Sequence, residues 1–395
     1  MASQEILREE PSRGSFINDP KVRGIFFQAV VVIVLVALVW WIVQNTIDNL
    51  TRLRIASGFG FLRGRAGFDI SDSAIAYSSD STYGRAILVG FINTLIVAVS
   101  GIITATIIGF ILGVGRLSHN WLIRKICTVY VEVFRNIPPL LVIFFWYSGV
   151  LSVLPPPRES INLPFSSFLN QRGFYFPRAM WGEGSWLILV ALLLGIAMAW
   201  FVARKARQRQ MATGQQFPVF WTSAALIIGL PLLAYALSGF PLSFDYPKQS
   251  TFNLTGGFQV KPEFLSLYLA LSFYTAAFIA EIVRAGIMGV SKGQTEAAGA
   301  LGLRPGSILR LVVIPQAMRI VIPPLTSQYL NLTKNSSLAI AIGYPDLTAT
   351  TGTVLNQTGQ AIECVLIMMV VYLALSLLTS AIMNVVNARM ALVER

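Results

Sequence analysis

Long apolar blocks separated by short polar segments dominate the chain, without the apolar–polar alternation of a half-buried strand. About 20 residues of helix cover the hydrocarbon core of a bilayer, and eight blocks come close to that length or exceed it. We therefore predict an all-α membrane protein with about eight transmembrane helices. The predicted spans are 25–43, 86–114, 128–154, 186–203, 217–240, 264–287, 316–342 and 362–386.

Prolines and glycines mark special positions inside these spans. Pro138-Pro139 breaks the third span, and Pro323-Pro324 is expected to interrupt the seventh, because proline has no backbone N–H to donate. In the second span, the spacing of Gly109 and Gly113 lets another helix approach closely.

Composition supports a membrane protein. Of 395 residues, 55% are hydrophobic and 12% are charged, whereas about a quarter of a soluble protein is charged. The net charge of +12 sits at the ends of apolar blocks, where membrane topology places it. No basic face or reader motif points to nucleic acid. Cys127 and Cys364 are far apart and are expected to be small buried hydrophobes, and His119 lies in a loop without ligand partners, so no metal site is expected.

The distribution of basic residues predicts the topology. An even number of spans puts both termini on one side, and a cytoplasmic N-terminus places 18 Lys and Arg residues inside and 10 outside. The polar segment 1–24 is then a cytoplasmic tail, 25–45 a first peripheral span that is retained in the membrane, and 46–85 a periplasmic loop. The five arginines of the stretch 52–85 run against this rule.

The segment 288–315 differs from every other loop. An Ala-rich stretch beginning with an acid, Thr295 to Leu301, predicts one short helix, and Gly302 permits a turn because it tolerates positive φ. Pro305 suits the first turn of a second helix, whose apolar face holds Leu309, Leu311 and Val312. Two short helices at an angle are expected.

This segment resembles the coupling motif of ABC-importer permeases: Glu-Ala-Ala, three residues, Gly, nine residues, Ile, one residue, Leu-Pro. The match is Glu296-Ala297-Ala298, Gly302, Val312 and Ile314-Pro315, with conservative apolar departures at Val312 and Ile314. In that family the elbow docks into a cleft of the ATP-binding subunit. The resemblance thus implies an ATPase-coupling role for Glu296, Ala297, Ala298, Gly302, Arg304 and Pro315.

The resemblance extends over most of residues 55–390. The segments that carry it are Gly58–Ile70, Arg116–Trp121, Tyr130–Leu141 and Pro315–Leu347. They are similar to one permease chain of the broad-specificity L-amino acid importers, related to glutamate, glutamine and aspartate systems, in the inner membrane of bacteria with two membranes. The resemblance implies a type I importer permease domain at 86–390, with five core spans, peripheral spans and a two-span insertion at about 186–240.

The same resemblance implies the partners. They are a second homologous permease, so that a heterodimer is expected, an ATP-binding subunit dimer and a periplasmic amino-acid-binding protein. The sequence has no Walker A pattern of Gly, four residues, Gly-Lys-Ser/Thr. ATP and Mg are therefore expected on the partner subunit, with no cofactor in this chain and no catalytic residues.

Polar residues inside spans are candidates for a substrate path, because polar groups at membrane depth are costly unless they face protein or water. An amino acid needs donors for its carboxylate, such as Lys334 or Arg135, and acceptors for its ammonium, such as Glu132 or Glu281. The full set of candidates is Asn93, Glu132, Arg135, Tyr274, Glu281, Gln328, Tyr329, Asn331, Lys334, Asn335, Ser336 and Ser337.

Structural alternatives remain open for several candidates. Glu132 and Arg135, and likewise Glu281 and Arg284, are spaced to pair with each other on one helix. Lys334 either lines a path or extends to the membrane interface. Asn93 and Tyr274 either face the path or bond neighbouring helices.

Two other functions compete with an importer permease. A secondary transporter driven by an ion gradient accounts for the interrupted span and the buried charges but gives no reason for the elbow. A membrane enzyme lacks support, since no Ser/His or paired-Asp arrangement occurs within the spans.

Overall fold

The computed structural model describes residues 20–52, 57–250 and 253–390, so most of the predicted tail 1–24 lies outside the described residues. The described part contains seven helices long and apolar enough to cross a membrane, or eight if one sharply bent pair forms a single span. The prediction of an all-α membrane protein with about eight transmembrane helices is confirmed.

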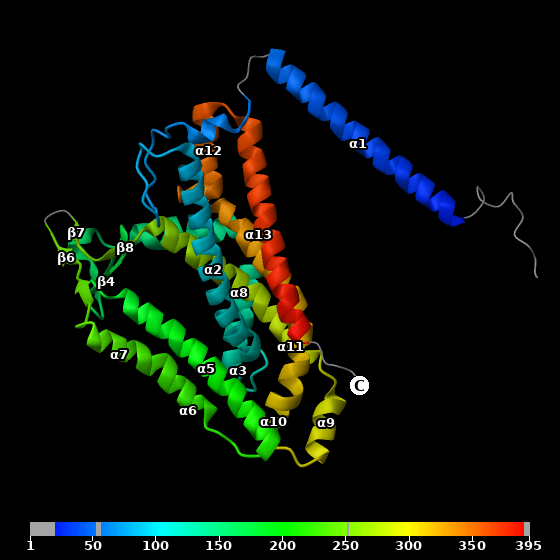
Figure 1. The fold of residues 1–395 in the computed structure, drawn as a ribbon, viewed down its shortest axis with the longest axis vertical. Helices are drawn as coiled ribbons and strands as arrows, with labels where there is room; N and C mark the ends of the chain where they lie inside the picture. Colours follow the sequence, from blue (N-terminus) through cyan, green and yellow to red (C-terminus); the bar gives the residue numbers. More distant parts are fainter. Residues whose placement is uncertain (1–19, 53–56, 251–252, 391–395) are drawn as a thin grey trace, which may run out of the picture.

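A bundle of long helices forms the centre of the molecule (Figure 1). The long helices are α1 (Pro20–Arg52), α2 (Tyr83–Gly115), α5 (Trp186–Thr213), α8 (Pro262–Met288), α11 (Ile314–Asn335) and α13 (Ala361–Met390). The shorter helices are α3 (Trp121–Arg135), α4 (Pro139–Phe144), α6 (Val219–Ala224), α7 (Leu230–Leu237), α9 (Lys292–Ala300), α10 (Pro305–Ile308) and α12 (Leu347–Thr358). Figure 1 places α12 at one end of the bundle and α9 and α10 at the other. We call these the α12 end and the elbow end.

Close packing of α2 against α8 forms the core of the bundle. A Cβ atom added to Gly109 would lie 2.6 Å from Cβ of Ile279, and one added to Gly113 would lie 2.7 Å from the carbonyl oxygen of Ala280. The predicted close approach at these glycines is confirmed. The buried aliphatic residues of α2, α8 and α11 form one hydrophobic cluster around this contact.

The third predicted span is a bent pair of helices. The chain bends by 111° between the helical segments Trp121–Arg135 and Pro139–Val153. The second member consists of α4, a π-helical segment Phe145–Val150 and a 3-10 turn Leu151–Val153. The break at the two prolines was predicted, because proline ends the helix before it. The start at residue 128 was wrong, since Asn120 caps α3 by accepting from the N–H of Leu122.

The seventh span also differs from its prediction. It starts at Pro305, not near residue 316, and continues through a π-helical segment, Leu309–Val313, into α11 and a 3-10 segment, Ser336–Ile342. The helix α11 runs through Pro323 and Pro324, so the expected interruption was wrong. Each proline leaves one carbonyl without its helical N–H partner, a loss that membrane helices tolerate with small local adjustments.

Short strands occupy the two loops beside the inserted spans, which the sequence had not predicted. The strands are β1 (Ile161–Leu163), β2 (Ser167–Asn170), β3 (Gly173–Phe176), β4 (Arg178–Trp181), β5 (Leu242–Asp245), β6 (Lys248–Gln249), β7 (Leu254–Thr255) and β8 (Phe258–Val260). They form an antiparallel sheet of order β1-β2-β3-β8 and the pairs β4–β5 and β6–β7. Helices α5, α6 and α7 form a hairpin at the place of the predicted two-span insertion, and we call it the inserted hairpin. Pairing of β4 with β5 joins its two ends.

Two parts of the chain lie at the periphery. The inserted hairpin pairs α5 with α6, a π-helical segment Ala225–Gly229 and α7, at a contact where the backbone of Gly195 closely approaches Leu226. Figure 1 shows α1 apart from the bundle, and none of its described side chains is buried. Cys127 and Cys364 are buried and unpaired, as expected.

Candidate functional site

A tight turn at Gly302 joins α9 to α10. The N–H of Gly302 donates to the carbonyl of Gly299 at 2.9 Å, and the N–H of Leu303 donates to the carbonyl of Ala298 at 3.3 Å. These are the two hydrogen bonds of a Schellman helix ending, which needs a left-handed residue. Gly302 supplies it with a φ of 75°. Two short helices joined by a turn at Gly302 are therefore present as predicted, although α9 begins at Lys292 and not at Thr295.

Most of the predicted coupling residues lie on the surface of this elbow, which we define as residues 292–313. Glu296, Ala297, Gly302 and Arg304 are exposed, whereas Ala298 is buried. Figure 1 shows α9 and α10 projecting from one end of the bundle. The elbow therefore presents both an acidic and a basic side chain on its exposed surface.

The elbow is continuous with the membrane helix that follows it. Pro315 lies in the first turn of α11 directly after the π-helical segment Leu309–Val313. Because Pro315 has no N–H, the regular α-helical bonding pattern fails there, and a wider turn accommodates the lost bond. Gln316 also donates to the side-chain oxygen of Gln294 at 3.3 Å, which links α11 to α9. The chain itself and this bond therefore both connect α9 to α11.

Three of the predicted path residues, Glu132, Arg135 and Glu281, belong to a charge network that links α2, α3 and α8. Glu281 of α8 accepts hydrogen bonds from Arg116, at the end of α2, and from Arg284. Arg135 of α3 lies 3.8 Å from the same carboxylate, and Glu132 lies 3.8 Å from Arg116. The predicted Glu281–Arg284 pair is confirmed, but the charges of Glu132 and Arg135 pair with Arg116 and Glu281 rather than with each other. Glu281 thereby joins α2, α3 and α8.

Two other path residues, Asn331 and Lys334, lie with Ser327 on an exposed polar stripe of α11. Ser327, Asn331 and Lys334, spaced by four and three residues, share one helix face and are exposed. No acidic side chain of the described residues lies within ion-pair distance of Lys334. Because exposed polar groups are costly in lipid, this stripe must face another protein surface or water.

The remaining path residues have partners inside the subunit. Asn93, which is 2% exposed, donates to the carbonyls of Asp72 and Pro345 at 2.8 and 2.9 Å. Tyr329 and Thr106 bond through their hydroxyls at 2.9 Å. Tyr274 packs its ring against Phe278 at 5.0 Å. The contacts of Asn93 and Tyr329 join separate parts of the chain, whereas that of Tyr274 lies within α8. Half-buried Gln328, Asn335 and Ser337 flank the stripe, and Ser336 is buried with its hydroxyl bonded to Thr333.

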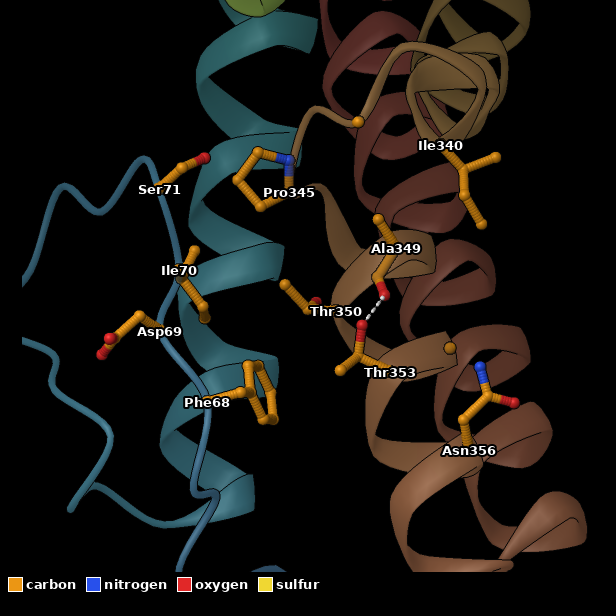
Figure 2. Close-up of a pocket in the computed structure, with 12 residues that line it drawn as sticks. Phe68, Asp69, Ile70, Ser71, Ile340, Pro345, Ala349, Thr350, Thr353 and Asn356 are labelled. Carbon is orange, nitrogen blue, oxygen red and sulfur yellow. Dashed lines mark hydrogen bonds between the residues drawn. The ribbon is translucent and has the colours of Figure 1, made fainter.

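A cavity of about 470 Å³ at the α12 end was not found from the sequence. Figure 2 shows the ring of Phe68 in the first loop on the side that faces Thr350 and Thr353 of α12, whereas Asp69 points away from α12. The hydroxyls of Thr350 and Thr353 and the amide of Asn356 supply both donors and acceptors here. The family resemblance of the Gly58–Ile70 stretch was a signal in the sequence that this loop matters. Its position next to α12 became visible only in the folded structure.

Comparison with known proteins gives the family. Residues 191–392 match the family model of the binding-protein-dependent transport system inner membrane component. The chain is 66% identical to the general L-amino acid transport system permease protein AapQ of Rhizobium johnstonii, over 96% of this chain and 95% of the relative. The chain belongs to the permease family of amino acid ABC importers.

Two further relatives cover almost the whole permease. The putative amino-acid ABC transporter permease protein YhdX of Escherichia coli is 50% identical over 96% of this chain and 97% of the relative. The glutamate/glutamine/aspartate/asparagine transport system permease protein BztB of Rhodobacter capsulatus is 42% identical over 98% of this chain and 100% of the relative. The permease is thus a multi-pass inner-membrane transport subunit, and the resemblance found in the sequence is confirmed.

The charge network makes a prediction about stability. Glu281→Gln is expected to lower the free energy of unfolding of the permease by several kcal/mol, because three guanidinium groups lose their shared carboxylate in a partly buried site. Glu132→Gln is the matched control, since the Glu132 side chain is 56% exposed and its single pair is worth about 1 kcal/mol or less. Thermal unfolding of the purified assembly measures both. A stable Glu281→Gln variant that no longer transports would instead favour a direct substrate role.

Asp346 predicts a pH dependence. It lies between the last two spans, caps α12 by accepting from the N–H of Ala349, and is fully buried. Burial raises the pKa of Asp346 from 3.8 to about 6. The folded state therefore binds a proton on the Asp346 carboxyl more tightly than the unfolded state does. This difference adds to the free energy of unfolding in full below pH 4, and the contribution is lost as the pH rises through 6.

The measurement compares melting temperatures between pH 5 and pH 8. Asp346→Asn keeps the capping oxygen without a charge, so the variant is expected to lose less stability than the parent permease as the pH rises across this range. Asp80→Asn, at an exposed aspartate, should leave the profile unchanged. If the melting temperature of Asp346→Asn differs from that of the parent permease by the same amount at pH 5 and at pH 8, Asp346 is ionised throughout this range and the prediction is wrong.

Proposed function

We propose that this permease forms half of a translocation path for L-amino acids, which a periplasmic binding protein delivers and ATP hydrolysis on a separate subunit drives. The exposed elbow supports this most strongly. Its free surface at Glu296 and Arg304 suits docking to an ATPase, and its continuity with α11 carries force into the membrane. ATP-driven closure of the ATPase pair would then shift the spans between inward- and outward-facing populations.

The polar stripe on α11 supports a second permease subunit. In this chain alone the stripe faces outward, so a path between two homologous subunits would enclose it. Lys334 would meet the substrate carboxylate, since Arg135 already lies beside Glu281. The ammonium would meet backbone carbonyls and the amide oxygens of Gln328 or Asn331. The relatives named for general L-amino acids and for glutamate, glutamine, aspartate and asparagine support this substrate class.

The topology follows from the same proposal. The elbow end faces the cytoplasm, together with the N- and C-termini, and the α12 end faces the periplasm. The cavity between the first loop and α12 would then lie on the side where the binding protein releases its substrate. ATP and Mg would bind only to the partner ATPase.

Reconstitution in proteoliposomes tests the proposal against an ion-driven carrier. The permease with its partner permease, ATPase and binding protein should accumulate labelled amino acids only when ATP is supplied on the elbow side. Removal of the binding protein should stop uptake. Uptake driven by a proton or sodium gradient in the absence of ATP would favour a secondary transporter and overturn the proposal.

A further inference from the structure

A cluster of four basic residues ends the first helix of the inserted hairpin. Arg204, Lys205, Arg207 and Arg209 lie in the last three turns of α5, and all four are exposed. We call them the basic collar. Figure 1 places this end of α5 at the elbow end of the molecule, beside the start of α6.

The collar has no acidic counterpart. No aspartate or glutamate occurs between Glu183 and Asp245. Within the described residues, no carboxylate lies within ion-pair distance of any collar residue. Four uncompensated positive charges within six positions therefore create a local field that attracts anions.

The collar also borders hollow surface. A cavity of about 520 Å³ is lined by Lys205 and Arg209, together with the aromatic rings of Phe201 and Phe217. A groove of about 570 Å³ on the neighbouring face is lined by Arg204, Arg207 and Met211. Arg209 donates to the side-chain oxygen of Gln215 at 3.0 Å, which directs it toward the connection to α6. The positive charges thus surround spaces whose walls are partly apolar.

An apolar surface continues from these spaces along α5. Leu189, Leu193 and Trp200 are exposed on the side of α5 that carries Arg204 and Arg207, and Met198 and Phe201 are exposed on the side that carries Lys205 and Arg209. Arg204 lies 5.4 Å from the centre of the Trp200 ring, and Lys205 lies 4.9 Å from that of Phe201. These cation–π contacts hold the charges at the boundary between apolar helix and polar surface. A ligand that matches both parts is an amphiphile with an anionic head and hydrocarbon chains.

The hairpin's own packing leaves room for such a ligand. Its helices pack mainly on one another, and only Gly195, Ala199 and Ala206 of α5 are buried. Large apolar side chains on both arms of the hairpin, such as Leu193, Trp200 and Leu233, are exposed. Its surface is therefore available to lipid.

We propose that the basic collar binds the phosphate of an anionic phospholipid headgroup, with the acyl chains lying along the exposed face of α5. Clusters of basic side chains at the end of a membrane helix attract anionic lipids by about 1 kcal/mol per charge. Phosphate suits the arginines, which present several donors in a fixed plane. The bound lipid fixes the end of the inserted hairpin at the membrane surface. This inference does not depend on which solute the permease carries.

Native mass spectrometry of the delipidated, intact transporter assembly tests the proposal. Phosphatidylglycerol and phosphatidylcholine are titrated separately onto the parent assembly and two double variants. Lys205→Gln/Arg209→Gln removes two charges from the cavity. Arg124→Gln/Lys125→Gln removes two exposed charges from α3 and is the matched control. Unchanged size-exclusion profiles establish that both variants assemble.

The expected result is selective. The collar variant should bind phosphatidylglycerol about tenfold more weakly or worse, while the control variant changes less than twofold. Binding of phosphatidylcholine should not change in either variant. Raising the salt concentration should weaken phosphatidylglycerol binding to the parent assembly.

Three outcomes would overturn the proposal. Equal weakening in both variants would mean diffuse attraction to the whole basic surface. Inorganic phosphate that binds the collar as tightly as phosphatidylglycerol would mean a soluble anion site. Cross-links from position 205 to another polypeptide in the intact assembly, with no lipid bound there, would mean a protein-covered surface.

Discussion

Reversing the charge of Glu296 is expected to abolish ATP-driven amino acid uptake while leaving the permease folded. Glu296 is exposed on α9 and, within the described residues, forms no ion pair. Glu296→Lys therefore removes nothing that stabilises the subunit. It places a positive charge on the surface proposed to dock to the ATPase, where a like-charge contact costs several kcal/mol.

Two readouts separate docking from folding. Uptake into proteoliposomes should fall to background, and the ATPase should no longer co-purify with the permease in equal amounts. Thermal unfolding of the permease should shift by no more than about 0.5 kcal/mol, the usual range for exposed sites. Glu159→Lys is the matched control, because it makes the same charge change at an exposed position in a loop remote from the elbow in sequence. Normal uptake by Glu296→Lys would contradict the coupling role of the elbow.

Gly113→Val is expected to disrupt packing of the bundle. A Cβ atom at position 113 would lie 2.7 Å from both the carbonyl oxygen of Ala280 and Cβ of Val283. Neither the backbone nor a branched carbon can rotate away, so α2 and α8 must separate. Overpacking of this kind costs about 3 kcal/mol or more, and it occurs close to Arg116 and Glu281, which join the same helices.

The change should be visible as a lower melting temperature and a smaller monodisperse fraction of the purified assembly. Gly113→Ala should show the same defect to a lesser extent. Gly229→Val is the control, since no neighbouring atom lies within 4 Å of a Cβ atom at that position in the hairpin. Similar melting temperatures for Gly113→Val and Gly229→Val would show that the α2–α8 contact can relax without loss of stability.

The two predictions test different parts of the permease: the exposed surface of the elbow and the packed contact between α2 and α8. The charge of Glu296 acts at a surface, where its effect depends on a partner, and the glycines act inside the subunit. Loss of uptake with a stable Glu296 variant, together with loss of stability at Gly113, would separate coupling from folding.

Local sequence determined the spans and the elbow. The eight apolar blocks are long enough for the bilayer, so helices form there whatever their neighbours. The turn at Gly302 and the start of α10 at Pro305 depend on backbone conformations that few residues adopt, and these are encoded by single residues. Both features were therefore predicted, with errors at their boundaries and at Pro323-Pro324, where the expected interruption is absent.

Contacts between distant segments could not be predicted in this way. The spacing of Glu132 and Arg135 on one helix indicated a pair, but Arg116 and Glu281 from other helices came closer. Strands β4 and β5 are separated by the whole inserted hairpin, and neither has a strong strand pattern alone. Prolines inside α11 indicated a break, yet α11 continues through them.

The sequence by itself thus determined which segments enter the membrane and where the elbow turns, because these depend on length, hydropathy and local backbone preference. The tertiary structure alone decided that Glu281 joins three helices, that the stripe at Ser327, Asn331 and Lys334 faces outward, and that the first loop meets α12 around a cavity. Those features depend on how the helices rotate and pack against each other. The local sequence of a helix does not specify which of its faces meets which neighbouring helix.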